Sequence, residues 1–296
     1  MICTYLRDEL LDLTLRSLTD QTADPSQYSV LVVDNAQQTS TRKVAAYYGV
    51  SYVVEPLLGH SHARNRGMLT ATTPWVLYLD DDVQLPPGLV QQFLMHLMSE
   101  KEYAAIGGWF KNWFRDPPPA WVRKYYGEGY RPSHQKSAGE LAPNLYLVGC
   151  LFAVYRPAWE AVGGFSDEVG MHGLAVGRAD EDELQQRLRA AGYRILYDPA
   201  IYIYHLVQPY KYTISGQLQL AYATGRDGVG MRGERVINLG ELLMQYIRIT
   251  GYSLPFNLAR WLLKPGYHWQ NLVVDTMTKY AFSWGQYCTH RKLSQP

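Results

Sequence analysis

Cysteine is scarce in this chain of 296 residues, and its few copies follow no disulfide or metal-binding spacing. Cys3, Cys150 and Cys288 are odd in number and far apart. Small secreted scaffolds held by disulfides and zinc domains with paired cysteines are therefore excluded as classes. Isolated free thiols fit a reducing compartment, so we expect a cytoplasmic protein.

Long apolar runs are also missing. No stretch of 18 or more apolar residues occurs, which excludes a predicted membrane-spanning helix. Arg7, Asp8 and Glu9 interrupt the N-terminal region before an apolar segment develops, so we expect no secretory signal peptide. The length predicts one large domain, or one domain with a helical appendage.

A basic excess is absent from the chain as a whole, whose formal net charge is +1. Because proteins that bind many nucleic-acid phosphates usually carry such an excess, we expect no nucleic-acid partner. Residues 206–296 nevertheless hold ten Lys or Arg and four Asp or Glu, a net charge of +6. This basic, aromatic tail predicts a peripheral contact with the inner face of a membrane or with a lipid-linked acceptor. A homodimer interface and a solvated helical face are the alternatives.

The first hundred residues alternate between strand and helix patterns. Short apolar runs at 30–33, 51–54 and 75–79 predict buried strands, with helices between them. Such alternation indicates an α/β fold with a mostly parallel sheet covered by helices on both faces. Ligands bind beyond the carboxyl ends of parallel strands, so Asp34 and the acidic run 80–82 are expected to share one crevice.

The second half is more irregular. Proline and aromatic residues through 109–145 predict a long loop that binds an acceptor or covers the site, or else simply packs. Strands are expected at 146–155, 195–197 and 201–204, a helix at 180–191, and helices from about residue 215 onward. The aromatic residues considered for acceptor binding are Trp109, Trp113, Trp121, Tyr125 and Tyr126.

Three adjacent carboxylates, Asp80, Asp81 and Asp82, follow the predicted strand 75–79. Two unit charges in close contact repel by about 4 kcal/mol at an effective dielectric near 20. A divalent cation with a preference for oxygen ligands, Mg²⁺ or Mn²⁺, would offset that repulsion. The alternative is a solvated acidic turn at the end of a strand.

A second acidic run opens the predicted helix 180–191. Glu181 shares a helix face with Leu184 and Leu188, so we expect it to point toward the interior or the site, where it could act as a general base. Capping of the helix dipole is the simpler interpretation. His205 ends an apolar strand; beside an aspartate-bound metal it becomes a nitrogen ligand, although such a histidine is more often a packed residue.

Seven short segments occur in an order that resembles inverting glycosyltransferase family 2, which has the GT-A fold. The resemblance covers about residues 2–225, and Leu6 stands where the family usually has asparagine. The family's Glu-Asp pair aligns with Asp180-Glu181. The segments are Thr4-Tyr5-Leu6-Arg7, Val32-Val33-Asp34-Asn35, Gly59 with Ala63-Arg64-Asn65-Arg66-Gly67, Leu79-Asp80-Asp81-Asp82, Val162-Gly163-Gly164-Phe165, Asp180-Glu181-Asp182-Glu183-Leu184 with Arg187-Leu188, and Tyr197-x-Pro199 with His205.

The resemblance implies roles for individual residues. Glu181, or Asp182 if the helix register shifts, would be the catalytic base. The metal, Mn²⁺ or Mg²⁺, would be held by Asp80, Asp82 and His205. Contacts to the donor nucleotide would come from Thr4, Tyr5, Arg7, Asp34, Arg64, Asp80 and Asp81.

It also implies a domain plan and an activity. Residues 1–225 would form the Rossmann-like GT-A domain, with a nucleotide-sugar half at 1–108, an acceptor and catalytic half at 109–225, and a helical extension at 226–296. The enzyme would be a metal-dependent hexosyltransferase that moves a sugar, with inversion, from a nucleoside diphosphate sugar to a glycan, lipid-linked or small-molecule acceptor. A nucleotidyltransferase on a similar sheet is disfavoured because no glycine-rich phosphate loop with a lysine is present. A catalytically silent membrane scaffold is disfavoured because every expected carboxylate is present.

Overall fold

In the computed structural model, the described residues are 1–99, 103–166, 180–227 and 236–293. They fall into two compact units. Of these residues, unit 1 holds 1–99, 103–113, 128–166 and 180–206, and unit 2 holds 114–127, 207–227 and 236–293.

Unit 1 is built on a ten-stranded sheet with the order β3-β2-β1-β4-β9-β6-β10-β5, with β7 beside β6 and β8 beside β10. Six strands, β1, β2, β3, β4, β6 and β10, run in one direction. Strand β9 runs antiparallel between β4 and β6, and the two-residue strands β5, β7 and β8 are antiparallel to their partners. This arrangement confirms the predicted mostly parallel sheet. The strands are β1 (Ile2–Thr4), β2 (Leu31–Asp34), β3 (Ser51–Val54), β4 (Trp75–Asp80), β5 (Val83–Gln84), β6 (Tyr103–Trp113), β7 (Gly129–Tyr130), β8 (Gly139–Glu140), β9 (Leu151–Tyr155) and β10 (Arg194–Leu206).

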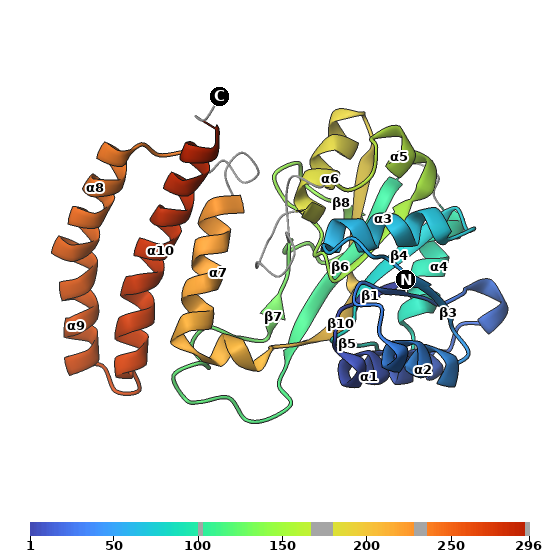
Figure 1. Ribbon diagram of the computed structural model, residues 1–296, viewed down its shortest axis with the longest axis horizontal. Coiled ribbons are helices and arrows are strands. Elements are labelled where there is room, and N and C mark those ends of the chain that lie inside the picture. Colours follow the sequence, from blue (N-terminus) through green and yellow to red (C-terminus); the bar gives the residue numbers. More distant parts are fainter. Residues whose placement is uncertain (100–102, 167–179, 228–235, 294–296) are drawn as a thin grey trace. The chain divides into compact units, whose positions relative to one another are not determined.

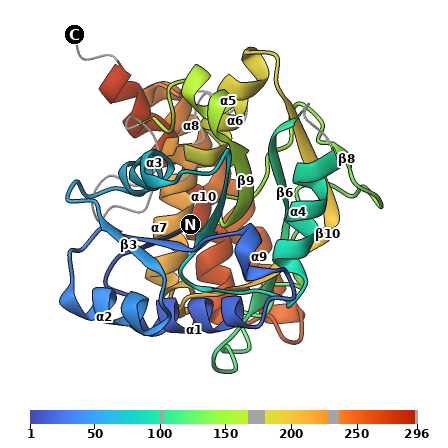
Figure 2. The ribbon, with the colours of Figure 1, turned by 90° about the vertical axis from the view of Figure 1, so that its right-hand side faces the viewer.

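Helices cover both faces of this sheet, because alternate side chains of each buried strand point to opposite sides. In β4, Leu79 belongs to one apolar core and its neighbour Tyr78 to the other. Figures 1 and 2 show α1 and α2 on one face of strands β1–β3 and α3 on the other. The core containing Leu79 also takes side chains from α4, whereas the core containing Tyr78 takes them from α5 and α6. The helices are α1 (Asp8–Thr19), α2 (Thr39–Tyr47), α3 (His60–Thr70), α4 (Leu89–Ser99), α5 (Arg156–Ala161) and α6 (Asp180–Ala190), with the 3₁₀ turn η1 (Pro25–Gln27).

One edge of the sheet collects the polar strand ends. The parallel strands β1, β2 and β4 end there at Thr4, Asp34 and Asp80. Because β9 runs in the opposite direction, its first residue, Leu151, lies at this same edge. Cys150, directly before Leu151, is therefore brought next to the end of β4.

The last long strand brings a histidine to that edge. His205 of β10 pairs with Val83 of β5, just after the acidic run. The backbone N–H of Leu206 donates to the carbonyl oxygen of Asp82 over 3.0 Å. These backbone contacts fix the imidazole beside the carboxylates.

Three predicted elements were wrong in their extent. Residues 109–113 continue β6 instead of opening a loop, and β7 and β8 interrupt the remainder of 109–145. Only Leu151–Tyr155 of the predicted strand 146–155 is extended. The two strands expected at 195–197 and 201–204 are one strand, β10, because a register shift between Tyr197 and Tyr202 absorbs Pro199 without ending the pairing with β6.

Unit 2 is helical, as the sequence predicts from about residue 215. Figure 1 shows α8 and α9 following one another along one side of α10, which also packs against α7. Among all the described residues, no helix is both long enough and apolar enough to cross a bilayer. The elements are η2 (Pro209–Tyr212), α7 (Ile214–Asp227), α8 (Leu239–Arg248), the π-helix η3 (Ile249–Ser253), α9 (Leu254–Leu263) and α10 (Trp269–Leu293).

The aromatic segment 114–127 packs within unit 2 instead of lying free. Trp121 is buried with Val122 against Val274 of α10. The side-chain amide of Asn271 donates to the carbonyl oxygen of Trp121 over 2.8 Å. The Tyr125 hydroxyl donates to Oδ1 of Asp275 in α10, also over 2.8 Å. Trp121 and Tyr125 are therefore packed side chains, in agreement with the third interpretation of this segment.

Candidate active site

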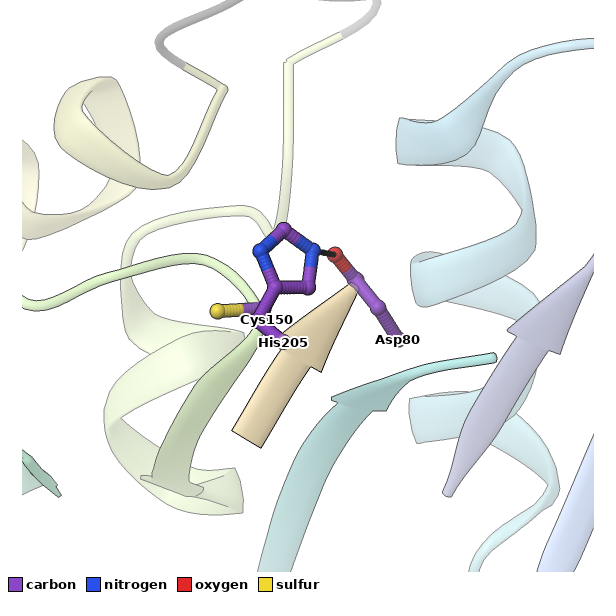
Figure 3. A group of neighbouring side chains, drawn as sticks. All are labelled: Asp80, Cys150 and His205. Carbon is purple, nitrogen blue, oxygen red and sulfur yellow. Dashed lines mark ion pairs between the residues drawn. The ribbon is translucent and has the colours of Figure 1, made fainter. Parts of the chain in front are cut away.

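An imidazole, a thiol and carboxylates converge at the end of β4, just before β9 and near the end of β10. One ligand atom each from Asp80, Cys150 and His205 lies within 4.8 Å of the other two (Figure 3). The Nε2 atom of His205 is 3.9 Å from Oδ2 of Asp80 and 3.2 Å from Oδ1 of Asp82. The structure thus brings together all three residues predicted to hold a metal.

The middle carboxylate of the acidic run faces the first loop instead. Asp81 is buried and accepts hydrogen bonds from Thr4 Oγ1 over 2.7 Å and from Arg7 Nη1 over 3.1 Å. Burial raises the pKa of Asp81 to about 7, and the Arg7 guanidinium opposes that rise. Three residues predicted to contact the donor, Thr4, Arg7 and Asp81, are therefore one connected group, whereas Tyr5 is a half-buried neighbour of it.

Arg64 of α3 links the acidic helix to the acidic strand end. Arg64 is only 2% exposed, and its guanidinium donates to Asp180 over 2.9 Å and to the carbonyl oxygen of Gly149 over 2.7 Å. The same group lies 3.9 Å from Glu181 Oε2 and 3.8 Å from Asp80 Oδ1. Two aromatic rings flank the guanidinium, which adds cation–π attraction. Arg64 is therefore a buried positive centre shared by carboxylates from α6 and β4.

The carboxylates of α6 occupy distinct environments. Asp180 and Asp182 are buried, whereas the Glu181 side chain keeps a partly exposed face. Burial and the adjacent Asp180 raise the pKa of Glu181 well above its ordinary value. Burial also penalises Asp180, but Arg64 and His60 outweigh it and lower the pKa of Asp180. Glu183 pairs with Arg187 one turn later.

A missing side chain at position 149 makes room for Glu181. A Cβ added to Gly149 would lie 2.8 Å from Glu181 Cδ and 3.1 Å from Arg64 Nη2. Because β9 begins two residues later, the glycine places Glu181 beside the strand edge that carries Cys150.

Asp34 is placed differently from the other predicted donor contacts. Its carboxylate is fully buried. It accepts hydrogen bonds from the backbone N–H groups of Ala36, Gln37 and Gln38 and from the Tyr52 hydroxyl over 2.7–3.1 Å. Asp34 therefore fixes the loop that follows β2.

Arginine supplies much of the positive charge that the acidic run requires. Arg7 Nη1 lies 3.1 Å from Asp81 and 3.8 Å from Asp82, and Arg64 approaches Asp80. The approach of His205, from β10, to Asp80 and Asp82 is thus a stronger indication of a cation site than the repulsion between the carboxylates.

The donor set at this corner suits a divalent cation. Carboxylate oxygens are ligands for Mg²⁺ and Mn²⁺, and imidazole is a common additional ligand for transition metals. The Cys150 thiol adds a soft donor, although burial raises its pKa well above the ordinary value. Since Mg²⁺ prefers an octahedral set of oxygens, the nitrogen and sulfur atoms favour Mn²⁺ or softer cations.

Sequence reasoning missed Cys150, Gly149 and His60 as members of the site. His60 lies 3.8 Å from both Asp80 and Asp180, and its burial lowers its pKa. The signal that could have found Cys150 is its place directly before an apolar strand. That signal required knowing that the strand runs antiparallel.

Comparison with known proteins identifies sequence relatives. The model of the family described as glycosyl transferase family 2 matches residues 1–161. Validoxylamine A glucosyltransferase of Streptomyces hygroscopicus subsp. limoneus is 38% identical over 100 residues, covering 32% of this chain and 22% of that protein. An uncharacterized glycosyltransferase of Mycobacterium tuberculosis (strain CDC 1551 / Oshkosh) is 40% identical over 75 residues, covering 25% of this chain and 34% of that protein. The matches thus span about a fifth to a third of these relatives.

Solved structures share the fold. The mannosyltransferase PcManGT from Pyrobaculum calidifontis, in complex with GDP-Man and Mn²⁺, matches with a TM-score of 0.62 at 16% identity, covering 94% of this chain and 84% of that one. Staphylococcus aureus TarS matches with a TM-score of 0.53 at 14% identity, covering 89% of this chain and 45% of that one. The predicted fold class, a mixed α/β sheet domain with a helical C-terminal region, is confirmed by this likeness.

Proposed function

The chain belongs to glycosyl transferase family 2, and from that membership we propose that it moves a sugar from a nucleoside diphosphate sugar to an acceptor hydroxyl. The observation that carries the proposal is the meeting of Asp80, Asp82 and His205 at one sheet edge, close to the acidic helix that holds Glu181. A cation site and a candidate base are the two groups that such a transfer needs.

Asp80, Asp82 and His205 would hold the divalent cation, with Mn²⁺ favoured over Mg²⁺ by the donor atoms present. When bound, such a cation would stabilise the negative charge on the departing diphosphate as a Lewis acid. The mannosyltransferase of similar fold was solved with GDP-Man and Mn²⁺, which supports this choice. Thr4, Tyr5, Arg7 and Asp81 would contact the donor nucleotide, and Asp34 would act by holding the loop after β2.

We propose Glu181 in preference to Asp182 as the base. Glu181 keeps a partly exposed face toward the strand edge, whereas Asp182 is buried. The carboxylate of Glu181 would take the proton from the acceptor hydroxyl. The oxygen of that hydroxyl would attack the anomeric carbon on the side opposite the leaving diphosphate, which inverts the configuration of that carbon. The raised pKa of Glu181 makes its carboxylate a stronger base than an ordinary glutamate. Arg64 would orient it.

The test compares Glu181→Gln with Asp182→Asn. Donor sugars are first chosen by thermal shift with UDP-, GDP- and dTDP-sugars in the presence of Mn²⁺. For the chosen donor, Glu181→Gln is expected to retain binding while sugar transfer falls about 10²–10⁴-fold, the usual contribution of a general base. Transfer that survives in Glu181→Gln and is lost only in Asp182→Asn would reassign the base. The absence of donor binding in the wild type would contradict the proposed function itself.

A further inference from the structure

Together, α8, η3 and α9 expose an unusual number of large apolar side chains. We call this surface the apolar arm. Trp261 is 43% exposed, and Leu262 and Leu263 are 67% and 80% exposed. Its exposed members are Leu239, Leu243, Met244, Ile247, Tyr252, Leu254, Phe256, Leu258, Trp261, Leu262 and Leu263.

The inner side of the arm already satisfies the packing of unit 2. Leu242 and Ile249 are buried, and the amide of Asn257 donates to Thr276 of α10 over 3.1 Å. A capping box between Asn238 and Glu241 fixes the start of α8. The exposed apolar side chains therefore contribute little to folding the unit, and large exposed apolar patches on a protein surface usually mark an interaction site.

The charges along the arm favour an anionic partner. Its exposed cations are Arg248 and Lys264, whereas its carboxylate, Glu241, is used to cap α8. Arg260 differs, because its guanidinium lies over the Tyr267 ring and 3.4 Å from Asp275. The apolar arm therefore combines apolar side chains with a net positive charge.

A cavity of about 580 Å³ beside η3 has the same charge character. Arg248 and Lys279 contribute to its lining, and none of its lining residues is acidic. The Lys279 ammonium donates to Ser253 Oγ over 2.9 Å, which holds it at the cavity wall. Tyr252 belongs both to this lining and to the apolar arm, so apolar and cationic surfaces are continuous.

We propose that the apolar arm docks on an anionic lipid bilayer, with its apolar side chains at the acyl boundary and Arg248, Lys264 and Lys279 facing lipid phosphates. Exposed apolar residues lie on several sides of α9, including Leu254, Phe256 and Leu262. A fluid lipid surface covers such a helix, whereas a second copy of the chain would cover one side. Interfacial helices with aromatic, leucine and basic residues bind anionic membranes in this way. The proposal depends on unit 2 alone and is independent of the proposed sugar transfer.

Flotation of the full chain with phosphatidylcholine vesicles, with and without a quarter of phosphatidylglycerol, tests the docking. We expect binding to the anionic vesicles and at least about tenfold weaker partitioning for Leu262→Glu, because a buried leucine contributes about 1.5–3 kcal/mol. Leu69→Glu, at a leucine of α3 that is also 67% exposed, is the matched control and should bind like wild type. Lys264→Gln should weaken partitioning about fivefold at low salt.

Light scattering of the same proteins separates membrane docking from self-association. A concentration-dependent dimer that Leu262→Glu abolishes, with no vesicle binding by the wild type, would overturn the proposal. Equal flotation of wild type, Leu262→Glu and Lys264→Gln would overturn it as well. Each variant should have the same thermal unfolding midpoint as wild type, because the substituted leucine and lysine lie outside the core.

Discussion

At the scale of single residues, Leu6 occupies a backbone conformation that leucine disfavours. Its φ angle is 53°, and its side chain is 58% exposed. The left-handed region costs ordinary L-residues about 1–2 kcal/mol, and asparagine tolerates it better. Asparagine is also the residue that the family resemblance leads one to expect at this position.

Leu6→Asn is therefore expected to raise the free energy of unfolding by about 0.5–1 kcal/mol in urea titrations. Leu57→Asn is the matched control, because Leu57 is 60% exposed and is not among the residues with positive φ. An equal gain in both variants would show that removal of exposed apolar surface, and not backbone strain, is responsible.

At the proposed cation site, Cys150 adds a sulfur atom to the oxygen and nitrogen donors. Cys150→Ser is expected to weaken binding of thiophilic Cd²⁺ at least about tenfold while changing Mg²⁺ binding little, because only the softer ion gains from sulfur. Calorimetric titration of each ion into the two proteins measures the difference. Unchanged Cd²⁺ affinity in the serine variant would show that the thiol does not contact the ion.

The proposed role of Glu181 as the general base predicts how turnover depends on pH. A general base works only when deprotonated, and burial beside Asp180 raises the pKa of Glu181 well above 4.5. The rate of sugar transfer should therefore rise with pH through that raised pKa and be lower in mildly acidic buffer. The pH profile of kcat measures this, and a rate independent of pH through the mildly acidic range would contradict the assignment.

The positions of single residues could be predicted from the sequence where they directly follow a recognisable strand. Asp80 and Asp82 end a recognisable apolar strand, and Thr4 and Arg7 lie in the first loop, so their placement at one edge follows from parallel strands. The roles of these residues in donor and metal binding stay a prediction. Cys150 could not be found in this way, because its position depends on the direction of β9.

At the scale of elements, Asp275 of α10 holds segment 114–127 in place. It interacts with Lys124 and accepts hydrogen bonds from Tyr125 and Tyr267 over 2.8 Å. Burial opposes its ionisation, but these donors outweigh burial and lower the pKa of Asp275. A carboxyl with a lowered folded-state pKa contributes stability above its unfolded pKa, and that contribution is lost as pH falls through the folded value.

Asp275→Asn is therefore expected to lower the free energy of unfolding of unit 2 by about 1.5–3 kcal/mol at neutral pH, the range for hydrogen bonds to a charged group. The difference from wild type should shrink below pH 4, as the wild-type carboxyl becomes protonated. Urea unfolding at the two pH values measures it. Asp20→Asn, at the exposed end of α1, should change neither value, and a constant deficit at both pH values would contradict the electrostatic explanation.

Element boundaries were predictable where apolar periodicity was uninterrupted. The helix at 180–191 and the strand ending at Asp34 agree with α6 and β2 within a residue. The extent of β6 was missed because its glycines and charged end resemble a loop. Pro199 lies between the two strands predicted at 195–197 and 201–204, which are both part of β10. In the folded sheet a register shift accommodates that proline, and only strand pairing reveals it.

At the scale of the whole molecule, the order of the seven short segments was sufficient to predict the family, and the alternation of strands and helices was sufficient to predict the fold class. A parallel sheet places the carboxyl ends of its strands at one edge, so the position of the site could also be predicted. The predicted boundary at residue 225 stays a prediction. The division between the two described units instead depends on segment 114–127, which joins the helical unit through long-range packing. No local composition signal in that proline-rich stretch indicates such a partner.

The most direct test is calorimetric titration of UDP and GDP into wild type and Asp82→Asn, with and without Mn²⁺. If Asp80, Asp82 and His205 hold a cation that receives the diphosphate, wild type should bind one of the two nucleotides at least about tenfold more tightly with Mn²⁺. That gain should disappear in Asp82→Asn, whose fold is checked by thermal unfolding. Nucleotide binding of equal strength with and without Mn²⁺, or an undiminished gain in Asp82→Asn, would contradict it.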